Sequence, residues 1–484
     1  MAKILLINPS KWGRGITPIW IASHSACLKK DGHEVELFDA TFYENWTFNE
    51  TSYNTNNKQY SPTDYLNVIS FSKNDIVKDF IKKCNSFKPD IIFWSAISSH
   101  IHGEGEYVNI QYGYEIAKNF VNPNTILLTG GLQATAVPKK IFNLMSRIDY
   151  LIRGESDLVL NEVANNFNNK KTLEEIRGLC YKKSNKIISN RPQKIINDMD
   201  VIPQYDYSIF DPQVFLRPYN GRILRAVDYE LSRGCMFACE YCVETVIQKY
   251  YGFEETSSRG TILGAKNYLR NKSASRIFEE ITYLNKEFKI ELFRCQDTNF
   301  LSIDRKMLKE LSELISESNL KIMLYIETRP EGINSPAVEL LKKLKVDGIG
   351  MGIELSSQEF REDKLKRFAD TDKTIKAFGL LKEAGIKRTT YNIIGLPEQD
   401  EQSIKETIEY NRLLDPDNIT VAFYSPYIGT AQQIKASEEE YFDDYEDDVD
   451  GQLRTLSKHV LISSETLNYY KKNFISLVRE KNNL

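Results

Sequence analysis

The stretch ELSRGCMFACEYCVE, residues 230–244, holds three of the seven cysteines of the chain, at positions 235, 239 and 242. With so few cysteines in 484 residues, this triplet would arise by chance only about once or twice per thousand such chains. The spacing therefore needs a chemical reason.

Few metal centres suit three cysteines. A structural zinc ion takes four ligands, and the five histidines, at 24, 33, 100, 102 and 459, all lie away from the triplet along the chain. A disulfide among the three cysteines is disfavoured to the same degree as a zinc site. An iron–sulfur cluster normally takes four cysteines, so three leave one iron open to a substrate or cosubstrate. We therefore expect Cys235, Cys239 and Cys242 to hold a 4Fe-4S cluster with one open corner.

Composition and charge narrow the class of protein. The chain is 41% hydrophobic and 11% aromatic, as in ordinary globular domains, and its net charge of −4 offers no field that would attract a phosphate backbone. The N-terminus, MAKILLINPS, has an apolar run of only four residues, and no window reaches the roughly 18 apolar residues of a membrane span. We expect a cytoplasmic protein with reduced thiols, no membrane span and no nucleic acid partner.

Apolar runs alternate with amphipathic stretches over residues 1–168, which is the pattern of a buried parallel sheet covered by helices. The runs are KILLINP, HEVELFDA, PDIIFWSA, TILLTGG and DYLIRG. They predict a doubly wound, Rossmann-like α/β domain that binds its ligand at the carboxyl ends of the strands. Residues 41–75, rich in Asn, Thr, Ser and Tyr, are interpreted as a surface insertion, with a lid over the ligand as the alternative.

A second alternating series occupies residues 225–430, after an extended connector over 169–224. Its six strand–helix units are fewer than the eight of a closed barrel, and polar residues follow the strands where barrel enzymes keep their chemistry. The series predicts a partial (β/α)6 barrel with an open side. The C-terminal segment, 431–484, includes the acidic tract 437–451, which is interpreted as a solvated loop.

The pattern CxxxCxxC, with the aromatic Tyr241 directly before the last cysteine, resembles that of the radical S-adenosylmethionine (radical SAM) superfamily. The resemblance implies that the open iron chelates the amino and carboxylate groups of S-adenosylmethionine, and that cleavage of this cosubstrate gives a 5′-deoxyadenosyl radical. It also implies an external electron donor of the flavodoxin or ferredoxin type.

Other barrel segments resemble the cosubstrate-binding segments of the same superfamily. GIGMGIELSS nominates Glu354 and Ser356; YNIIGLPE nominates Ile393 and Gly395, with Glu398 also matching and Tyr391 replacing the first glycine. RCQDTNF replaces the usual GGE-like segment and leaves Asp297 as the candidate for the amino-group contact. Arg329 is a candidate for the same cavity, and a structural or surface role is the alternative for Asp297 and Arg329. Cys295 is expected to be a small buried residue, with a thiol near the substrate as the alternative.

The order of doubly wound domain, connector and barrel over residues 1 to 430 resembles the cobalamin-binding branch of the superfamily. The resemblance implies a corrin over the mouth of the barrel, with Ser95, Gly130 and Gly131 in its pocket. The segment DGHEVE departs from the DxHxxG motif of cobalt-ligating domains, because Glu36 stands where glycine belongs. We therefore interpret His33 as a surface turn residue.

One further group of polar residues is the loop after the third strand. His100, His102, Glu104 and Glu106 are interpreted as a polar loop at the ligand-binding edge, with a metal site as the alternative.

Taken together, the resemblances imply a cobalamin-dependent radical SAM methyltransferase acting on an unactivated carbon of a small molecule. A radical oxidoreductase or cyclase that transfers no methyl group is the alternative. A cluster-holding protein without enzymatic activity is a third hypothesis, and the segments around Glu354 and Gly395 argue against it because a cluster carrier needs no cosubstrate site.

Overall fold

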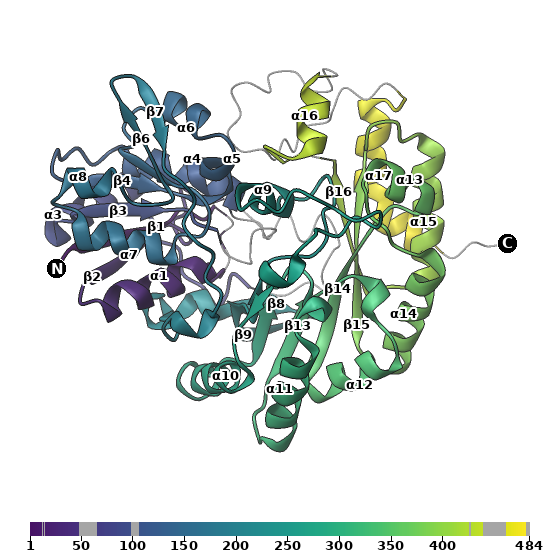
Figure 1. Ribbon diagram of the computed structural model, residues 1–484. Helices are drawn as coiled ribbons and strands as arrows, with labels where there is room; N and C mark the ends of the chain where they lie inside the picture. Colours follow the sequence, from purple (N-terminus) through teal and green to yellow (C-terminus); the bar gives the residue numbers. More distant parts are fainter. Residues whose placement is uncertain are drawn as a thin grey trace.

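The computed structural model describes residues 1–11, 13, 15–47, 65–97, 106–424, 427–438 and 461–480. Two α/β units lie side by side, one around each of two seven-stranded sheets (Figure 1). Residues 48–64 of the insertion 41–75, most of the acidic tract 437–451, and the loop with His100, His102 and Glu104 lie outside the described residues.

The first sheet has the order β2-β1-β3-β4-β5-β6-β7 and is parallel from β2 to β5. Its parallel strands are β1 (Lys3–Asn8), β2 (Glu34–Asp39), β3 (Ile91–Trp94), β4 (Ile126–Thr129) and β5 (Tyr150–Ile152). The chain reverses its winding direction between β1 and β3. The carboxyl edge at such a switch point is where open α/β sheets bind ligands.

Helices cover both faces of this sheet, which confirms the predicted doubly wound class. Because strand side chains alternate between faces, Ile4 and Leu6 of β1 pack with α1 and α7, whereas Leu5 and Ile7 pack with α3, α4 and α6. The helices are α1 (Ile19–Lys30), α3 (Ile76–Phe87), α4 (Glu106–Ala117), α5 (Gly131–Ala136), α6 (Pro138–Leu144), α7 (Asp157–Asn166) and α8 (Lys170–Leu173).

The connector predicted over 169–224 is not extended throughout, so this prediction was wrong in part. Strands β6 (Leu179–Lys183) and β7 (Lys186–Ser189) form a hairpin that continues the first sheet antiparallel to β5. Its turn uses Ser184 and Asn185, both with positive φ, and it lacks the glycine that usually marks such a turn in a sequence. Three short 3-10 helices complete the connector: η2 (Met199–Val201), η3 (Tyr207–Ile209) and η4 (Pro212–Phe215).

The second sheet is a half-barrel, as predicted. Its order is β8-β9-β12-β13-β14-β15-β16, with six parallel strands from β9 to β16 and the edge strand β8 antiparallel to β9. The strands are β8 (Leu216–Tyr219), β9 (Arg222–Tyr229), β12 (Leu292–Cys295), β13 (Met323–Glu327), β14 (Val346–Glu354), β15 (Lys387–Ile394) and β16 (Asn418–Phe423); the small ladder of β10 (Ser232–Arg233) and β11 (Arg270–Asn271) lies beside them.

The helices of the half-barrel begin at residues that the sequence marks clearly. From α10 to α15, each starts after a Ser, Asp or Asn whose side chain accepts a hydrogen bond from the backbone N–H three residues on: Ser273, Asp304, Asn334, Ser357, Asp370 and Asp400. The helices are α9 (Glu244–Tyr250), α10 (Ala274–Phe288), α11 (Arg305–Glu317), α12 (Ser335–Lys343), α13 (Gln358–Lys364), α14 (Thr371–Glu383), α15 (Glu401–Leu414), α16 (Ala431–Glu438) and α17 (Ser464–Arg479). Among the described residues, none of the helices is long and apolar enough to cross a membrane.

The two units share one apolar core. A continuous cluster of buried side chains runs from α1 and α7 through Tyr205, Tyr207 and Phe215 of the connector to β9 and α10. Polar contacts reinforce it: the backbone N–H and hydroxyl of Thr17 donate to Asp228 Oδ2 on β9, at 3.0 and 3.2 Å, and Arg217 donates to the same carboxylate. The loop after β1 is therefore fixed to the wall of the half-barrel.

His33 is not a surface residue, contrary to the sequence interpretation. Its side chain is buried beneath the N-terminus, where Nδ1 accepts from the backbone N–H of Ala2 at 3.1 Å and Nε2 lies 3.1 Å from Asn165 Oδ1. The turn after α1 leads directly into β2, so its side chain packs between β1 and α7. His33 has a structural role.

We expect Gly113→Ala to destabilise the first unit. A Cβ at Gly113 on α4 would lie 2.0 Å from Cδ1 of the fully buried Trp94, so the variant should lose about 1–3 kcal/mol of unfolding free energy. Gly379→Ala on α14 is the matched control, because nothing lies within 4 Å of its added Cβ and helix propensity alone should stabilise it by roughly 0.5–1 kcal/mol. Urea unfolding by circular dichroism and tryptophan fluorescence measures both; equal midpoints would contradict the packing argument.

Candidate active site

A cavity of about 430 Å³ lies inside the half-barrel, at the carboxyl ends of its strands. The three cysteines of the triplet all line it, so the structure brings the predicted cluster ligands to one place. Of the other predicted residues, Tyr241, Arg329, Glu354 and Ile393 also line it. The remaining lining includes Ile16 from the first unit, so the cavity reaches the boundary between the two units.

The cysteine loop is held by a buried carboxylate at its base. Glu244 Oε1 accepts from the backbone N–H of Cys235 at 3.1 Å and from the hydroxyl of Tyr268 at 2.7 Å. Gly234 has φ +93, and a Cβ there would lie 2.7 Å from the backbone oxygen of Tyr268, so glycine is required. Burial, followed by the charge of Glu244, raises the pKa of the Cys235 thiol to about 12. A metal centre must therefore displace a proton from this thiol, and metal coordination does this.

Two buried arginines flank the cysteines. Arg329 lies over the ring of Phe237, 3.8 Å from its centroid, and its Nη1 lies 3.7 Å from Cys239 Sγ. The Nε of Arg329 is buried and has no hydrogen-bond partner in the part of the chain that the structure describes. Arg367 donates to the backbone oxygen of Gly352 at 2.5 Å and lies 3.6 Å from Glu354 Oε1. This wall of the cavity suits an anionic group.

Glu354 occupies the end of β14 in a strained backbone conformation. Its φ is +61, and its Oε1 accepts from the hydroxyl of Tyr241 at 2.9 Å. A Cβ at Gly352 would lie 2.3 Å from the same Oε1, so the glycine makes room for the carboxylate. The residue before the third cysteine and the end of β14 are thus joined directly across the cavity.

Several predicted site residues lie outside the cavity lining. Ser356 turns toward α15, where its backbone N–H donates to Thr407 Oγ1 at 3.1 Å. Gly395 has φ +79 and donates to Gln399 Oε1 at 2.7 Å. Glu398 pairs with Lys364 at 2.7 Å, on the wall of a separate groove of about 320 Å³. Cys295 is buried in β12 and is not among the lining residues.

Asp297 supports the cysteine loop and does not face the cavity. Its Oδ1 accepts from the backbone N–H groups of Leu231 and Ser232, at 3.1 and 2.6 Å, and from the hydroxyl of Ser232 at 2.5 Å. Burial is the main cause that raises the pKa of Asp297 to about 7. The geometry assigns Asp297 to the backbone that leads into the cysteines.

Sequence reasoning missed the polar residues on the inner face of the barrel. The cavity is lined by Arg294 on β12, Gln296 directly after β12, and Glu327 on β13, and also by Thr298, Asn299 and Arg367. Arg294 and Gln296 are two residues apart, and this period of two in an otherwise apolar strand is the signal that could have identified them.

Tyr391, which replaces a superfamily glycine, reaches into the same cavity. Its hydroxyl donates to Glu327 Oε1 at 3.0 Å and lies 3.0 Å from the hydroxyl of Tyr325. A Cβ at Gly350 would lie 2.2 Å from the Tyr391 hydroxyl, so the neighbouring strand leaves space for the ring. The departure from the motif therefore places a phenol against a buried carboxylate.

The ligand-binding edge of the first sheet carries the residues predicted for it. Ser95 follows β3 at the switch point with φ +60, and its buried Oγ has no hydrogen-bond partner among the described residues. Gly131, at the start of α5, has φ +91, and a Cβ at Gly130 would lie 3.1 Å from the backbone oxygen of Ser95. The Ser95 hydroxyl is thus available to hydrogen-bond a polar ligand. Because Gly130 and Gly131 have no side chains, such a ligand can approach the backbone closely.

Residues 229–410, which include the cysteine loop and strands β12 to β15, match the family described as the radical SAM superfamily. This unit of the chain is a radical SAM domain. Such a domain uses a 4Fe-4S cluster and S-adenosylmethionine, and it needs an electron donor.

Similar proteins extend the comparison beyond the radical SAM domain. The chain is 25% identical over 352 residues to the "Uncharacterized methyltransferase PH0819" of Pyrococcus horikoshii, covering 73% of this chain and 70% of that protein. It is 23% identical over 373 residues to the anaerobic magnesium-protoporphyrin IX monomethyl ester cyclase of Rubrivivax gelatinosus, covering 75% of this chain and 61% of the cyclase. The solved structure of the radical SAM methyltransferase TsrM from Kitasatospora setae, with cobalamin and a 4Fe-4S cluster bound, has a TM-score of 0.65 at 16% identity over 91% of this chain and 75% of TsrM. The two chains share their fold across both units.

The raised pKa of Asp297 predicts a pH dependence of stability. Because the folded-state pKa of about 7 exceeds the ordinary value of 3.8, the contribution of the protonated carboxyl is present at low pH and is lost as the pH rises toward 7. Asp297→Asn keeps an acceptor and should lack this decline, whereas Asp297→Ala should lose about 1–3 kcal/mol at any pH because it leaves buried donors unpaired. Urea unfolding of the cluster-free protein at pH 5 and pH 8 measures the difference, and a wild-type slope retained in the Asn variant would refute the assignment.

Proposed function

We propose that the chain is a cobalamin-dependent radical SAM methyltransferase acting on an unactivated carbon of a small molecule. The observation that carries the proposal is the shared wall of the two sites. Ile97 and Leu132, beside Ser95 and Gly131 at the edge of the first sheet, pack in one apolar cluster with Val243 and Val246, which follow Cys242. Ligands at the two sites would thus meet in one water-poor space.

The residues around the cysteines fit the cluster and its cosubstrate. When bound, the cluster and S-adenosylmethionine supply a radical strong enough to remove hydrogen from carbon. Arg329, whose Nε has no hydrogen-bond partner among the described residues, and Arg367 are suited to hold the carboxylate of the cosubstrate. Glu354 is suited to accept hydrogen bonds from its ribose hydroxyls, and Ile393 to contact its adenine. These roles are proposals. For Ser356 and Gly395 we propose that they support the cosubstrate site by fixing the backbone beside it.

The edge of the first sheet fits a corrin. Ser95 offers a hydroxyl without a partner among the residues described, and Gly130 and Gly131 allow the tail of the ligand to approach the backbone. When bound, cobalamin supplies a carrier for the methyl group. TsrM, which has a similar fold, binds cobalamin in its solved structure. We propose this role for the domain over 1–168, with 225–430 as the catalytic barrel and 431–484 as a specificity segment.

A second function, ring formation or oxidation without methyl transfer, is favoured by the similarity to the cyclases. That similarity covers 75% of this chain. The product separates the two functions, because only the methyltransferase transfers a labelled methyl group to its substrate. We further propose a cytoplasmic enzyme that is reduced by a flavodoxin or ferredoxin and has no nucleic acid partner, since its net charge of −4 offers no attraction to phosphate.

The proposal is tested by anaerobic purification from cells supplied with cobalamin. We expect corrin and iron–sulfur absorption in stoichiometric amounts, and transfer of label from methyl-labelled S-adenosylmethionine to a small molecule of a host extract. Iron–sulfur absorption without corrin, even after reconstitution, would overturn the cobalamin role. Corrin present with an unlabelled, cyclised or oxidised product would favour the second function.

The ligand role of the triplet is tested by Cys235→Ala. The variant should lose the cluster absorption near 400 nm and fall to background in 5′-deoxyadenosine formation, on the order of a thousandfold, because a 4Fe-4S cluster needs each thiolate. Cys295→Ala is the control, since Cys295 is buried in β12 outside the cavity and should retain both signals. Turnover that survives in Cys235→Ala would show that the cluster assignment is wrong.

A further inference from the structure

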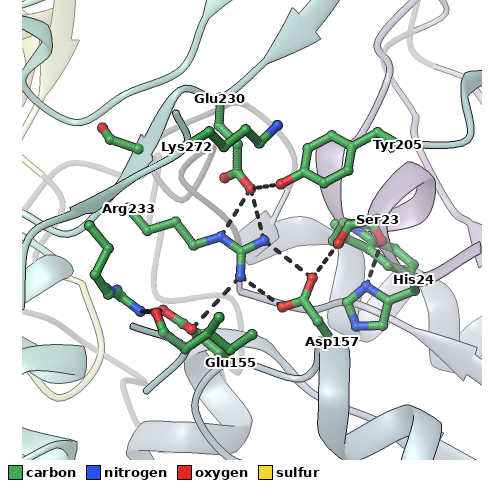
Figure 2. Close-up of polar contacts among 12 residues, drawn as sticks. Ser23, His24, Glu155, Asp157, Tyr205, Glu230, Arg233 and Lys272 are labelled. Atoms are coloured by element: carbon green, nitrogen blue, oxygen red, sulfur yellow. Dashed lines mark hydrogen bonds and ion pairs between the residues drawn. The ribbon is translucent and has the colours of Figure 1, made fainter. Parts of the chain in front are cut away.

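The segment RGESD, residues 153–157, has no part in the cavity, yet it touches the radical SAM domain on both sides of the cysteine loop. It connects β5 to α7 in the first unit. Figure 2 shows two of its carboxylates, Glu155 and Asp157, turned toward the guanidinium of Arg233. Arg233 stands two residues before Cys235.

The contact before the cysteines is a forked ion pair between the two units. Asp157 Oδ2 accepts from Nη1 of Arg233 at 2.7 Å, and Asp157 Oδ1 accepts from Nη2 at 3.2 Å. Glu230 of the radical SAM domain accepts from Nε and Nη2 of the same arginine, at 2.9 and 2.8 Å. Paired N–H···O bonds fix the plane and the position of a guanidinium, so Asp157 and Glu230 together determine where Arg233 lies.

Glu155 extends this contact to the strand that pairs with Arg233. Its Oε1 accepts from Nη1 of Arg270 at 2.7 Å, and its Oε2 lies 3.8 Å from Arg233 Nη1. Arg270 and Arg233 are directly paired in the two-stranded ladder of β10 and β11. One residue of the first unit therefore touches both strands that enter and leave the cysteine segment.

The whole contact is buried. The side chains of Arg233, Asp157 and Glu230 are at most 4% exposed. Although burial opposes its ionisation, the neighbouring Arg233 holds the pKa of Asp157 well below its usual range. On the far side, Ser23 donates to Asp157 (Figure 2). His24 Nε2 lies 2.8 Å from Ser156 Oγ. Asp157 is thus held in place by the first unit itself.

The contact after the cysteines uses the backbone of the same segment. The N–H of Glu155 donates to the hydroxyl of Tyr251 at 2.8 Å, and Tyr251 directly follows α9, which begins two residues after Cys242. Gly154 has φ +77, and a Cβ there would lie 2.4 Å from the Tyr251 hydroxyl. The hydroxyl of Tyr251 therefore contacts the backbone at Gly154, where no residue with a side chain would fit.

We propose that Asp157, Glu155 and Gly154 are positioning residues for the cluster: they hold both flanks of the cysteine loop so that its three sulfurs are set for the cluster and its cosubstrate. The proposal depends on the radical SAM domain and not on methyl transfer. The first unit would then contribute to cluster geometry whatever it binds.

The alternative is that the segment only fastens the two units together. Two pairs of variants separate the roles. Asp157→Asn removes the charge that faces Arg233, and Glu280→Gln is its control, because Glu280 pairs with Lys272 at 2.8 Å, equally buried but within the radical SAM domain. Tyr251→Phe removes one hydroxyl beside Gly154. Tyr229→Phe is its control, because it also removes one hydroxyl, and that hydroxyl donates to Glu280 within the radical SAM domain and not to the segment 153–157.

The first measurement is amide hydrogen exchange of the cluster-free full chain. Peptides covering 233–250 should exchange about tenfold faster in Asp157→Asn and Tyr251→Phe than in their controls, while peptides of β13 to β15 exchange equally. This measurement needs no cluster, so it can fail or succeed independently of the proposed function.

The second measurement is electron paramagnetic resonance of the reduced, reconstituted enzyme with and without S-adenosylmethionine. The two variants should show a broadened cluster signal, a weaker change on adding S-adenosylmethionine, and roughly tenfold slower 5′-deoxyadenosine formation. Lower stability with an unchanged signal, or equal effects in variants and controls, would overturn the proposal. If Asp157→Asn does not fold, Tyr251→Phe decides.

Discussion

The structure depends on the carboxylates that neutralise the positive charge of Arg233, whose side chain is buried away from water. A buried charge that loses its partner costs about 3–5 kcal/mol, so the arginine requires the carboxylates around it. Glu230 comes from the same unit, three residues earlier in the chain, but Asp157 and Glu155 come from the other unit. The relative position of the two units is therefore a condition for burying the residue that leads into the cysteines.

Parallel strands explain why the chemistry gathers where it does. Both sheets present their carboxyl ends toward the boundary between the units, the first through Ser95 and Gly131 and the second through the cysteine loop and Glu354. Glycines then decide how closely groups approach: Gly352 gives room to Glu354, and Gly350 to Tyr391. The direction of the strands therefore places the cavity at this boundary, and the glycines leave space in it for the side chains of Glu354 and Tyr391.

Local patterns in the sequence predicted the two fold classes, the half-barrel strands and the gathering of the three cysteines in one place, because each depends on residues close together in the chain. The directions in which side chains point at the strand ends were harder to predict. Asp297 and Ser356 stand at strand ends, as predicted, yet Asp297 turns toward the cysteine-loop backbone while its neighbours Gln296 and Thr298 line the cavity. The pairing of Arg233 with Asp157 joins residues 76 positions apart and carries no local signal. The β6–β7 hairpin was missed because its Ser-Asn turn lacks glycine.

Ile16, Thr17 and the segment 153–157 belong to the first unit by sequence and to the second by contact. The order of the chain therefore does not define which residues complete each unit. Recombination that replaced the first sheet by that of a relative, at the connector after β7, would exchange the cavity wall at Ile16 and the acidic partners of Arg233 in one step.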